Sequence, residues 1–228
     1  MEVMIHACPA RMWYVEGWLI PVLERQGITR EHIRIWNDTE GHGNLISCME
    51  AFASCEGDGG TWHIQDDVLP RRGFARIAAE HDEGVVYGFC CQYFLDDPNL
   101  SGTVYMPDAW HSFQCVRIPN AWARECAEWF FSGAWESEAM DPDLPAMKDL
   151  NHGDDSFFGE FLMCRHGEGT AYNLRPNIVE HVDLLIGGSV LHQWRDYQAK
   201  AHWWDDPESV EELLAWLKAQ KTARAGKD

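Results

Sequence analysis

Short apolar runs alternate with helical patterns through the first 67 residues, and this order restricts the fold more than any other feature. Residues 3–7 (VMIHA), 33–36 (IRIW) and 61–67 (TWHIQDD) have the length and apolar content of buried strands. The two segments between them repeat apolar residues at three- and four-residue spacing, which is typical of helices that pack along one side. An order of strand, helix, strand, helix and strand predicts parallel strands joined by crossover helices.

The rest of the chain continues this alternation less regularly. Further strands are predicted at 85–94, 110–118 and 170–173, and further helices at 74–78, at 121–131 and from Asp154 onward. Residues 132–152 are rich in Gly, Pro, Asp and Ser and predict a long loop. We therefore expect an α/β fold, with a Rossmann-like, mostly parallel mixed sheet flanked by helices in three α/β/α layers.

The length of 228 residues suits one such domain. We expect residues 1–200 to form it and residues 201–228 to add a C-terminal helix and a basic tail packed on it. Asp206 is a predicted N-cap, with Pro207 at the first helical position. The predicted apolar stripe of this helix consists of Val210, Leu213, Leu214 and Leu217.

The composition excludes several classes of protein. A formal net charge of −19 argues against a protein that binds nucleic acid through its overall electrostatic field. Nucleic acid is therefore expected only as the acceptor of a transferred group. No run of about 18 apolar residues predicts a membrane span, and no secretory signal is visible. The eight cysteines form no CxxC pair, which favours reduced thiols in a cytoplasmic protein.

Acidic and polar pairs follow the predicted strands at three places. They are Asn37–Asp38, Asp66–Asp67 and Asp154–Asp155. In parallel α/β sheets, ligands bind at the carboxyl ends of the strands. Adjacent carboxylates repel each other unless a cation neutralises them, and oxygen ligands suit Mg²⁺ or Mn²⁺. Two interpretations of such a pair remain open. The first is a polar turn that ends a strand, and the second, more specific one is a metal or phosphate site.

Two further observations bear on this choice. Asp154 or Asp155 is a predicted N-cap of the following helix, which leaves the other carboxylate for a role as general base or substrate ligand. His181 lies between apolar neighbours, where a histidine is more often a core residue than a ligand. It becomes a candidate metal ligand only if the fold brings it to Asp67.

Several motifs in this order resemble one enzyme family. HIQDDVLP (63–70) followed by Phe74, GDDSFFG (153–159) and RPNIVEHVD (175–183) with Gly187, Gly188 and Ser189 resemble nucleotide-sugar-dependent glycosyltransferases of the A-type fold. The opening IHACPAR is similar to the first strand and nucleotide-binding loop of that family. The likeness spans roughly residues 3–190.

The resemblance implies a role for each matching position. Asp67 and His181 would hold Mn²⁺ or Mg²⁺ against the donor diphosphate, with Asp66 beside them. Asp154 and Asp155 would face the acceptor, one of them as base if the enzyme inverts. The positions near the nucleotide base, ribose and phosphates would be Ala7, Pro9, Arg11 and Asp38.

The leading interpretation is a metal-dependent glycosyltransferase that moves a sugar from a nucleoside-diphosphate sugar to a saccharide, a protein or a modified base. One alternative is a DNA-base glycosyltransferase acting on hydroxymethylated bases, which needs Arg71, Arg72 and the basic tail on one face. A second is a catalytically weakened nucleotide- or carbohydrate-binding module, because Gln65 stands where relatives often carry an acid. The tryptophans that could stack on sugars are Trp110, Trp135, Trp203 and Trp204.

Overall fold

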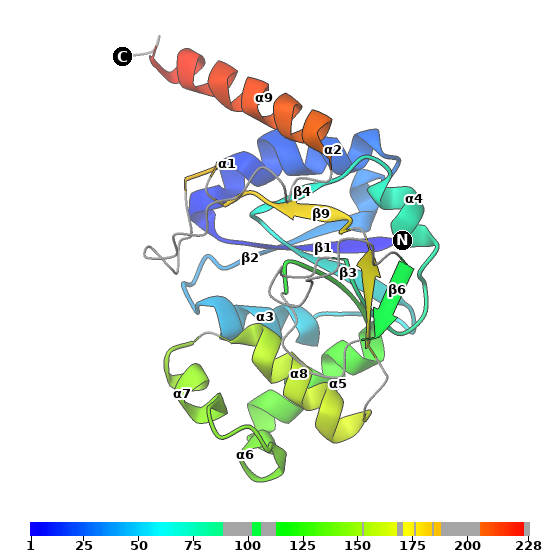
Figure 1. Cartoon of the computed structure of the whole chain (residues 1–228). Helices are drawn as coiled ribbons and strands as arrows, with labels where there is room; N and C mark the ends of the chain where they lie inside the picture. The colour runs from blue at the N-terminus through cyan, green and yellow to red at the C-terminus, as the bar shows by residue number, and fades with distance from the viewer. Residues whose placement is uncertain are drawn as a thin grey trace.

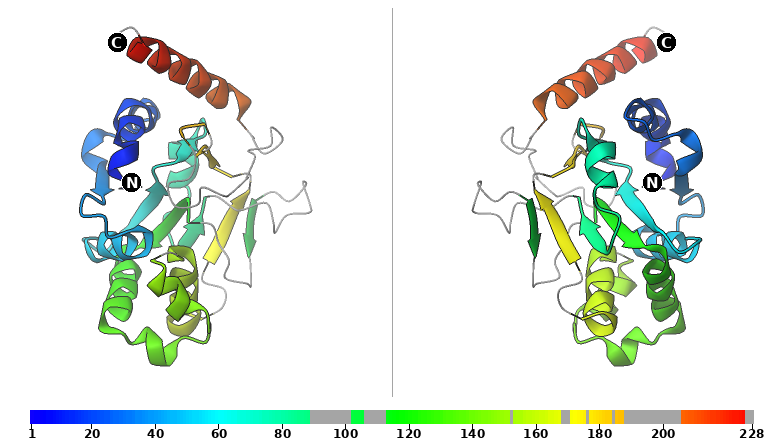
Figure 2. Two further views of the ribbon diagram at one scale, coloured as in Figure 1. Left: turned by 90° about the vertical axis from the view of Figure 1, so that its left-hand side faces the viewer. Right: turned by 90° about the vertical axis from the view of Figure 1, so that its right-hand side faces the viewer.

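In the computed structural model, a seven-stranded sheet lies between two layers of helices (Figure 1). The structure describes residues 1–88, 102–105, 113–151, 153–167, 171–175, 177–183, 185–187 and 206–225. The two side views show the same arrangement, with the strands between the helical layers (Figure 2). The predicted three-layer α/β/α class is confirmed.

The strands follow the order β2-β1-β3-β7-β5-β8-β6, and most of them run in one direction. Strands β1, β2, β3, β5 and β8 are parallel, whereas β7 and β6 run against them. A separate two-stranded antiparallel sheet pairs β4 (Val68–Pro70) with β9 (Val179–His181). The strands of the large sheet are β1 (Glu2–Ala7), β2 (Ile33–Asn37), β3 (Gly60–Gln65), β5 (Val85–Tyr87), β6 (Gly102–Tyr105), β7 (Cys115–Pro119) and β8 (Ala171–Arg175).

One helical layer follows β1 directly. A continuous helical segment runs from Pro9 to Arg25, and Gly27, at φ 94°, ends it in the left-handed region as predicted. Its apolar side packs on the sheet through fully buried Tyr14 and Leu19. The parts of this layer are η1 (Pro9–Arg11), α1 (Met12–Tyr14), the π-helical turn η2 (Val15–Leu19), α2 (Ile20–Arg25), the 3-10 turn η3 (Arg30–His32) and α4 (Phe74–Ala79).

The other layer consists mainly of three helices, α3 (Asn44–Ala53), α5 (Asn120–Ser132) and α8 (Asp154–Arg165). They form a second core cluster, in which Phe52 contacts Phe158 edge to face at 5.7 Å between ring centroids. The helix after β1 thus covers one face of the sheet, and the helix after β2 covers the other. The strand order reverses at β1, which has β2 on one side and β3 on the other, and α/β folds bind ligands at the carboxyl ends of the strands at such a reversal.

The C-terminal helix α9 (Pro207–Ala225) packs on the first layer (Figure 1). Asp206 accepts hydrogen bonds from the backbone N–H and the hydroxyl of Ser209 at 3.2 and 2.7 Å, so the predicted N-cap is confirmed. Val210 and Leu213 are buried in the core, but Leu214 is 42% exposed and does not belong to the stripe. The division into residues 1–200 and 201–228 stays a prediction.

Two local predictions differ from the structure. Residues 132–152 are not one long loop, because they contain α6 (Trp135–Glu138) and α7 (Leu144–Asp149), anchored by buried Trp135 and Leu144. Strand β6 was not predicted, and the part of segment 85–94 beyond residue 88 lies outside the described residues. Within the described part of the chain, no helix combines the length and apolarity needed to cross a membrane.

Candidate functional site

The carboxyl ends of β1, β2 and β3 meet at one edge of the sheet. These strands are parallel and paired in register, with Ala7 opposite Asn37 and His6 opposite Gln65. The backbone N–H of Asp38 donates to the carbonyl of Ala7 at 2.9 Å, which holds the loop after β2 against the end of β1. In the order β2-β1-β3 the direction of strand addition reverses between β1 and β3, so the carboxyl ends of these two strands are where an α/β fold binds its ligand.

The two aspartates occupy the turn between β3 and β4, and both are buried. Asp66 Oδ2 accepts the backbone N–H of Cys8 at 2.8 Å, which ties the turn to the loop after β1. Arg11 Nη1 donates to Asp66 Oδ1 at 2.9 Å and to Asp67 Oδ2 at 2.6 Å. The predicted nucleotide-loop arginine and the predicted metal-site acids thus form one buried ionic cluster.

His181 belongs to the same cluster. The pairing of β4 with β9 sets Val68 opposite His181, and His181 Nε2 lies 3.3 Å from Asp67 Oδ2. Asp183 adds a carboxylate 3.9 Å from the same nitrogen. The fold therefore meets the condition on which His181 was predicted as a ligand. Asp67 Oδ1 remains buried without a hydrogen-bond partner among the described residues.

The charges in the cluster shift one another's pKa values. Burial opposes ionisation of Asp67, but attraction to His181 and Arg11 outweighs it and lowers the pKa of this carboxyl. Burial and repulsion from Asp67 raise the pKa of Asp66 to about 6. Burial disfavours the charged form of His181, yet the pKa of His181 rises because Asp67 attracts this charge and accepts its hydrogen bond. Asp67 is thus the carboxylate that stays ionised.

The cluster offers few ligands for a divalent cation. No group of three or more His, Cys, Asp or Glu residues is arranged to hold a metal ion within the residues that the structure describes. Asp67 and His181 supply two donors, and Asp67 Oδ1 is an oxygen that lacks a partner. Mg²⁺-type ions commonly take one or two carboxylates and complete their shell with water and substrate phosphates. The pair fits a cation of that kind, with the diphosphate as the remaining ligand.

Asp38, Pro9 and Ala7 lie beside this cluster. Asp38 accepts the backbone N–H groups of His42 and Gly43 at 2.7 and 2.8 Å, so its carboxylate shapes the loop that leads into α3. Pro9 is exposed at the same edge, and Ala7 is buried at the end of β1. Their contacts with a base or ribose stay predictions.

Asp154 and Asp155 form a second cluster at the start of α8. The N-cap is Gly153, at φ 85°, so the prediction that Asp154 or Asp155 caps this helix is wrong. A side chain on residue 153 would meet Met147 Sδ at 2.8 Å, and the left-handed φ also favours glycine. Both acids instead lie in the first helical turn, where the helix dipole favours negative charge.

Sequence reasoning missed Asn44, which holds the second cluster together. Its Nδ2 donates to Asp154 Oδ1 at 2.6 Å and so joins the start of α3 to the start of α8. Asp154 is buried, and this burial together with repulsion from Asp155 raises the pKa of Asp154 to about 8. The signal for Asn44 was a polar residue after GHG at the start of a helix, but its partner lies 110 positions away.

A histidine pair was also missed. His6 Nε2 lies 2.8 Å from His63 Nδ1 on the neighbouring strand, and His63 is fully buried beside Phe52. Burial lowers the pKa of His6 from 6.5 to about 4. Burial also lowers the pKa of His63, so both histidines are neutral at pH 7, and the pair links β1 to β3 inside the sheet.

This pair predicts a loss of stability in acid. The unfolded chain protonates His6 near pH 6.5, whereas the folded chain does so only near pH 4, so stability falls as the pH drops between these values. Relative to a His6→Gln variant, the wild type should lose about 1–3 kcal/mol of unfolding free energy over this range. Urea unfolding at pH 7.5, 6.0 and 4.5 measures the difference. The His32→Gln variant, which removes a half-exposed histidine paired with Glu2, is the control. Parallel pH profiles for His6→Gln and wild type would contradict the prediction.

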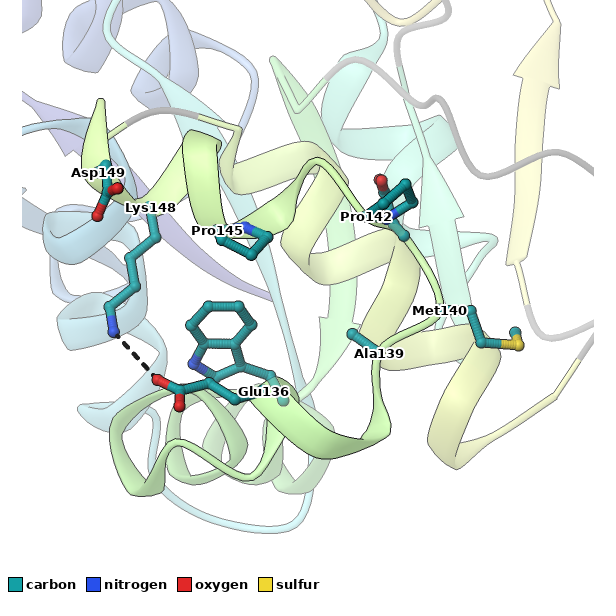
Figure 3. A pocket seen from close by; sticks show the side chains of 9 residues that line it. Glu136, Ala139, Met140, Pro142, Pro145, Lys148 and Asp149 are labelled. Carbon is teal, nitrogen blue, oxygen red and sulfur yellow. Dashed lines mark ion pairs between the residues drawn. The ribbon is translucent and has the colours of Figure 1, made fainter.

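A pocket of about 450 Å³ is formed by α6, α7 and the segment between them (Figure 3). Trp135 and Pro145 line it, and Lys148 Nζ lies 5.0 Å from the centroid of the Trp135 ring. Glu136 Oε1 pairs with the same ammonium at 3.7 Å. Trp135 is only 4% exposed and Lys148 lies over its ring, so the ring is not open to stack on a sugar in this structure. Trp110, Trp203 and Trp204 lie outside the described residues.

Comparisons with known proteins show distant similarity to solved structures. No family model matches the chain, and a search of the curated proteins found no match. Among solved structures, the crystal structure of S. aureus TarS (residues 1–349) is similar, with 11% sequence identity and a TM-score of 0.45. The match covers 78% of this chain and 59% of the TarS chain. At this level of similarity the neighbour indicates neither a substrate nor a reaction.

Proposed function

We propose that this protein is a glycosyltransferase that uses a nucleoside-diphosphate sugar as donor. The observation that carries the proposal is the contact between Asp67 and His181, at 3.3 Å, beside Arg11 at the carboxyl edge of the sheet. These two groups come from segments more than 110 residues apart in the sequence. They meet after β3, beside the end of β1 where the strand order reverses, which is the position at which α/β folds bind nucleotides.

The cluster suits a diphosphate leaving group. Asp67 and His181 would hold Mn²⁺ or Mg²⁺, and the bound cation would neutralise charge on the departing nucleoside diphosphate. Arg11 offers a guanidinium, which binds phosphate oxygens in a planar, bidentate geometry. Cys8 and Asp66 fix the loop on which Arg11 lies, through the 2.8 Å backbone hydrogen bond.

Of the two acids, we assign the role of general base to Asp154. Its pKa of about 8 lies close to neutral pH, the range in which a carboxylate accepts a proton most efficiently in a transition state. Asn44 orients the carboxyl by its 2.6 Å hydrogen bond, and Asp155 raises its basicity by repulsion. Asp154 would take the proton of the acceptor hydroxyl in an inverting transfer.

The observed ion pairs disfavour the DNA-base alternative. Arg72 is paired with Glu208 and Glu212 of α9, and its backbone N–H donates to Asp206. Acidic side chains of α9 thus lie beside one of the arginines that a DNA acceptor would need. A saccharide or protein acceptor agrees better with the net charge of −19.

A screen of nucleotide sugars for slow hydrolysis tests the proposal without knowledge of the acceptor. We expect one UDP- or GDP-linked sugar to be hydrolysed in Mn²⁺ or Mg²⁺, with a rate that falls at least about tenfold in EDTA. Hydrolysis of no donor, together with no binding of UDP or GDP, would refute the proposed function. Binding of a nucleotide without any turnover would instead support the catalytically weakened module.

A further inference from the structure

Arg11 occupies a place that a metal ion needs. One nitrogen, Nη1, touches a carboxylate oxygen of both Asp66 and Asp67, and the arginine side chain is only 7% exposed. A positive charge shared between two carboxylates does the electrostatic work of a bound cation. A guanidinium cannot give up its proton in a protein, so it repels any divalent ion brought to the same oxygens.

The two carboxylate oxygens of Asp67 differ in their hydrogen-bond partners. Oδ2 receives both Arg11 and His181, whereas Oδ1 is buried and has no partner among the described residues. A buried carboxylate oxygen without a hydrogen-bond partner calls for an explanation, and a bound ion is one such explanation. His181 Nε2, at 3.3 Å from Asp67, becomes available to a cation once it no longer hydrogen-bonds to Asp67.

From this geometry we infer that Arg11 and a divalent cation compete for Asp67, and that the donor diphosphate decides the competition by drawing Arg11 onto its own oxygens. The inference rests on the proposed function and adds a property to it. Without nucleotide, Arg11 holds the metal site closed. With nucleotide, the guanidinium moves to the phosphates and Asp67 binds the cation.

The arrangement requires that nucleotide and metal bind cooperatively. If the diphosphate removes Arg11 from Asp67, it raises metal affinity, and the metal raises nucleotide affinity by the same factor. A site with a permanently open carboxylate would bind Mn²⁺ without any nucleotide. The two arrangements therefore differ in the affinity for the metal alone.

The experiment titrates Mn²⁺ and follows the free ion by electron paramagnetic resonance, with and without UDP or GDP. Without nucleotide, the wild type should bind Mn²⁺ weakly. Arg11→Gln should bind Mn²⁺ at least about tenfold more tightly, because the guanidinium that competes with the ion is gone. Arg76→Gln, which removes an exposed arginine paired with Glu80, should behave like wild type. Arg11→Gln is expected to be less stable than wild type, so the titrations are done at low temperature. Near-UV circular dichroism checks that the variant is folded under these conditions.

The wild type alone supplies a second measurement that needs no variant. Mn²⁺ should raise the affinity of the protein for the nucleotide by about 5- to 150-fold. This factor is taken after correction for the Mn²⁺ that free nucleotide binds in solution. Equal Mn²⁺ affinity of wild type and Arg11→Gln, or no coupling in wild type, would overturn the inference and leave the proposed function standing. Failure of both proteins to bind Mn²⁺ even with nucleotide would instead refute the metal role in the proposed function.

Discussion

Replacing Asp67 with asparagine should lower the rate of donor hydrolysis by about 10²–10³-fold, the usual cost of losing one electrostatic contact to the developing charge. The substitution keeps the size of the side chain but removes the charge that attracts His181 and Arg11. It also removes the carboxylate that stays ionised, because the pKa of Asp67 is lowered by these two neighbours. Initial rates at saturating Mn²⁺, with the best donor from the screen, measure the effect.

The neighbouring acid provides the matched control. Burial and repulsion raise the pKa of Asp66 to about 6, so part of its charge is already neutralised near pH 6, and its Oδ2 accepts a backbone N–H. Asp66→Asn should therefore reduce hydrolysis by less than about tenfold at pH 6. Equal losses in the two variants would show that the turn as a whole is needed, rather than the charge of Asp67. Wild-type activity in Asp67→Asn would exclude Asp67 from the site.

The second large effect is on stability. Arg11→Met should lower the free energy of unfolding by about 3–5 kcal/mol, because breaking a buried ion pair leaves an uncompensated charge in the interior. Arg11 neutralises both Asp66 and Asp67, and all three side chains are almost completely buried. The loss should be smaller below pH 6, where Asp66 takes up a proton. Urea unfolding at pH 7.5 and 5.0 measures both values.

Arg76→Met is the control for this prediction. Its pair with Glu80 is exposed and of the i, i+4 type, so the change should stay within about 0.5 kcal/mol. A cost for Arg11→Met below about 1 kcal/mol would mean that water or a bound ion already neutralises the two aspartates. Adding Asp66→Asn to Arg11→Met should recover part of the lost unfolding free energy, because it removes one of the two buried carboxylates that lose their arginine partner.

Local patterns predicted much of the architecture. The strands β1, β2 and β3 and the helices between them were predictable, because apolar periodicity is a property of neighbouring residues. The helix after Pro9 ends at Gly27 as expected, since only a residue tolerant of positive φ fits there. Patterning was less informative at 132–152, where α6 and α7 are too short to show a repeat.

By itself, the sequence determined the layer order and the position of the acids at the carboxyl edge, because strand and helix periodicities and turn residues act over a few positions. Only the tertiary structure decided which side chains meet there. Arg11 lies 55 and 56 positions from its acidic partners, and His181 reaches Asp67 only because β9 pairs with β4 in one register. A shift of that register by one residue would turn His181 to the opposite face, so the candidate site depends on a long-range pairing that no local pattern encodes.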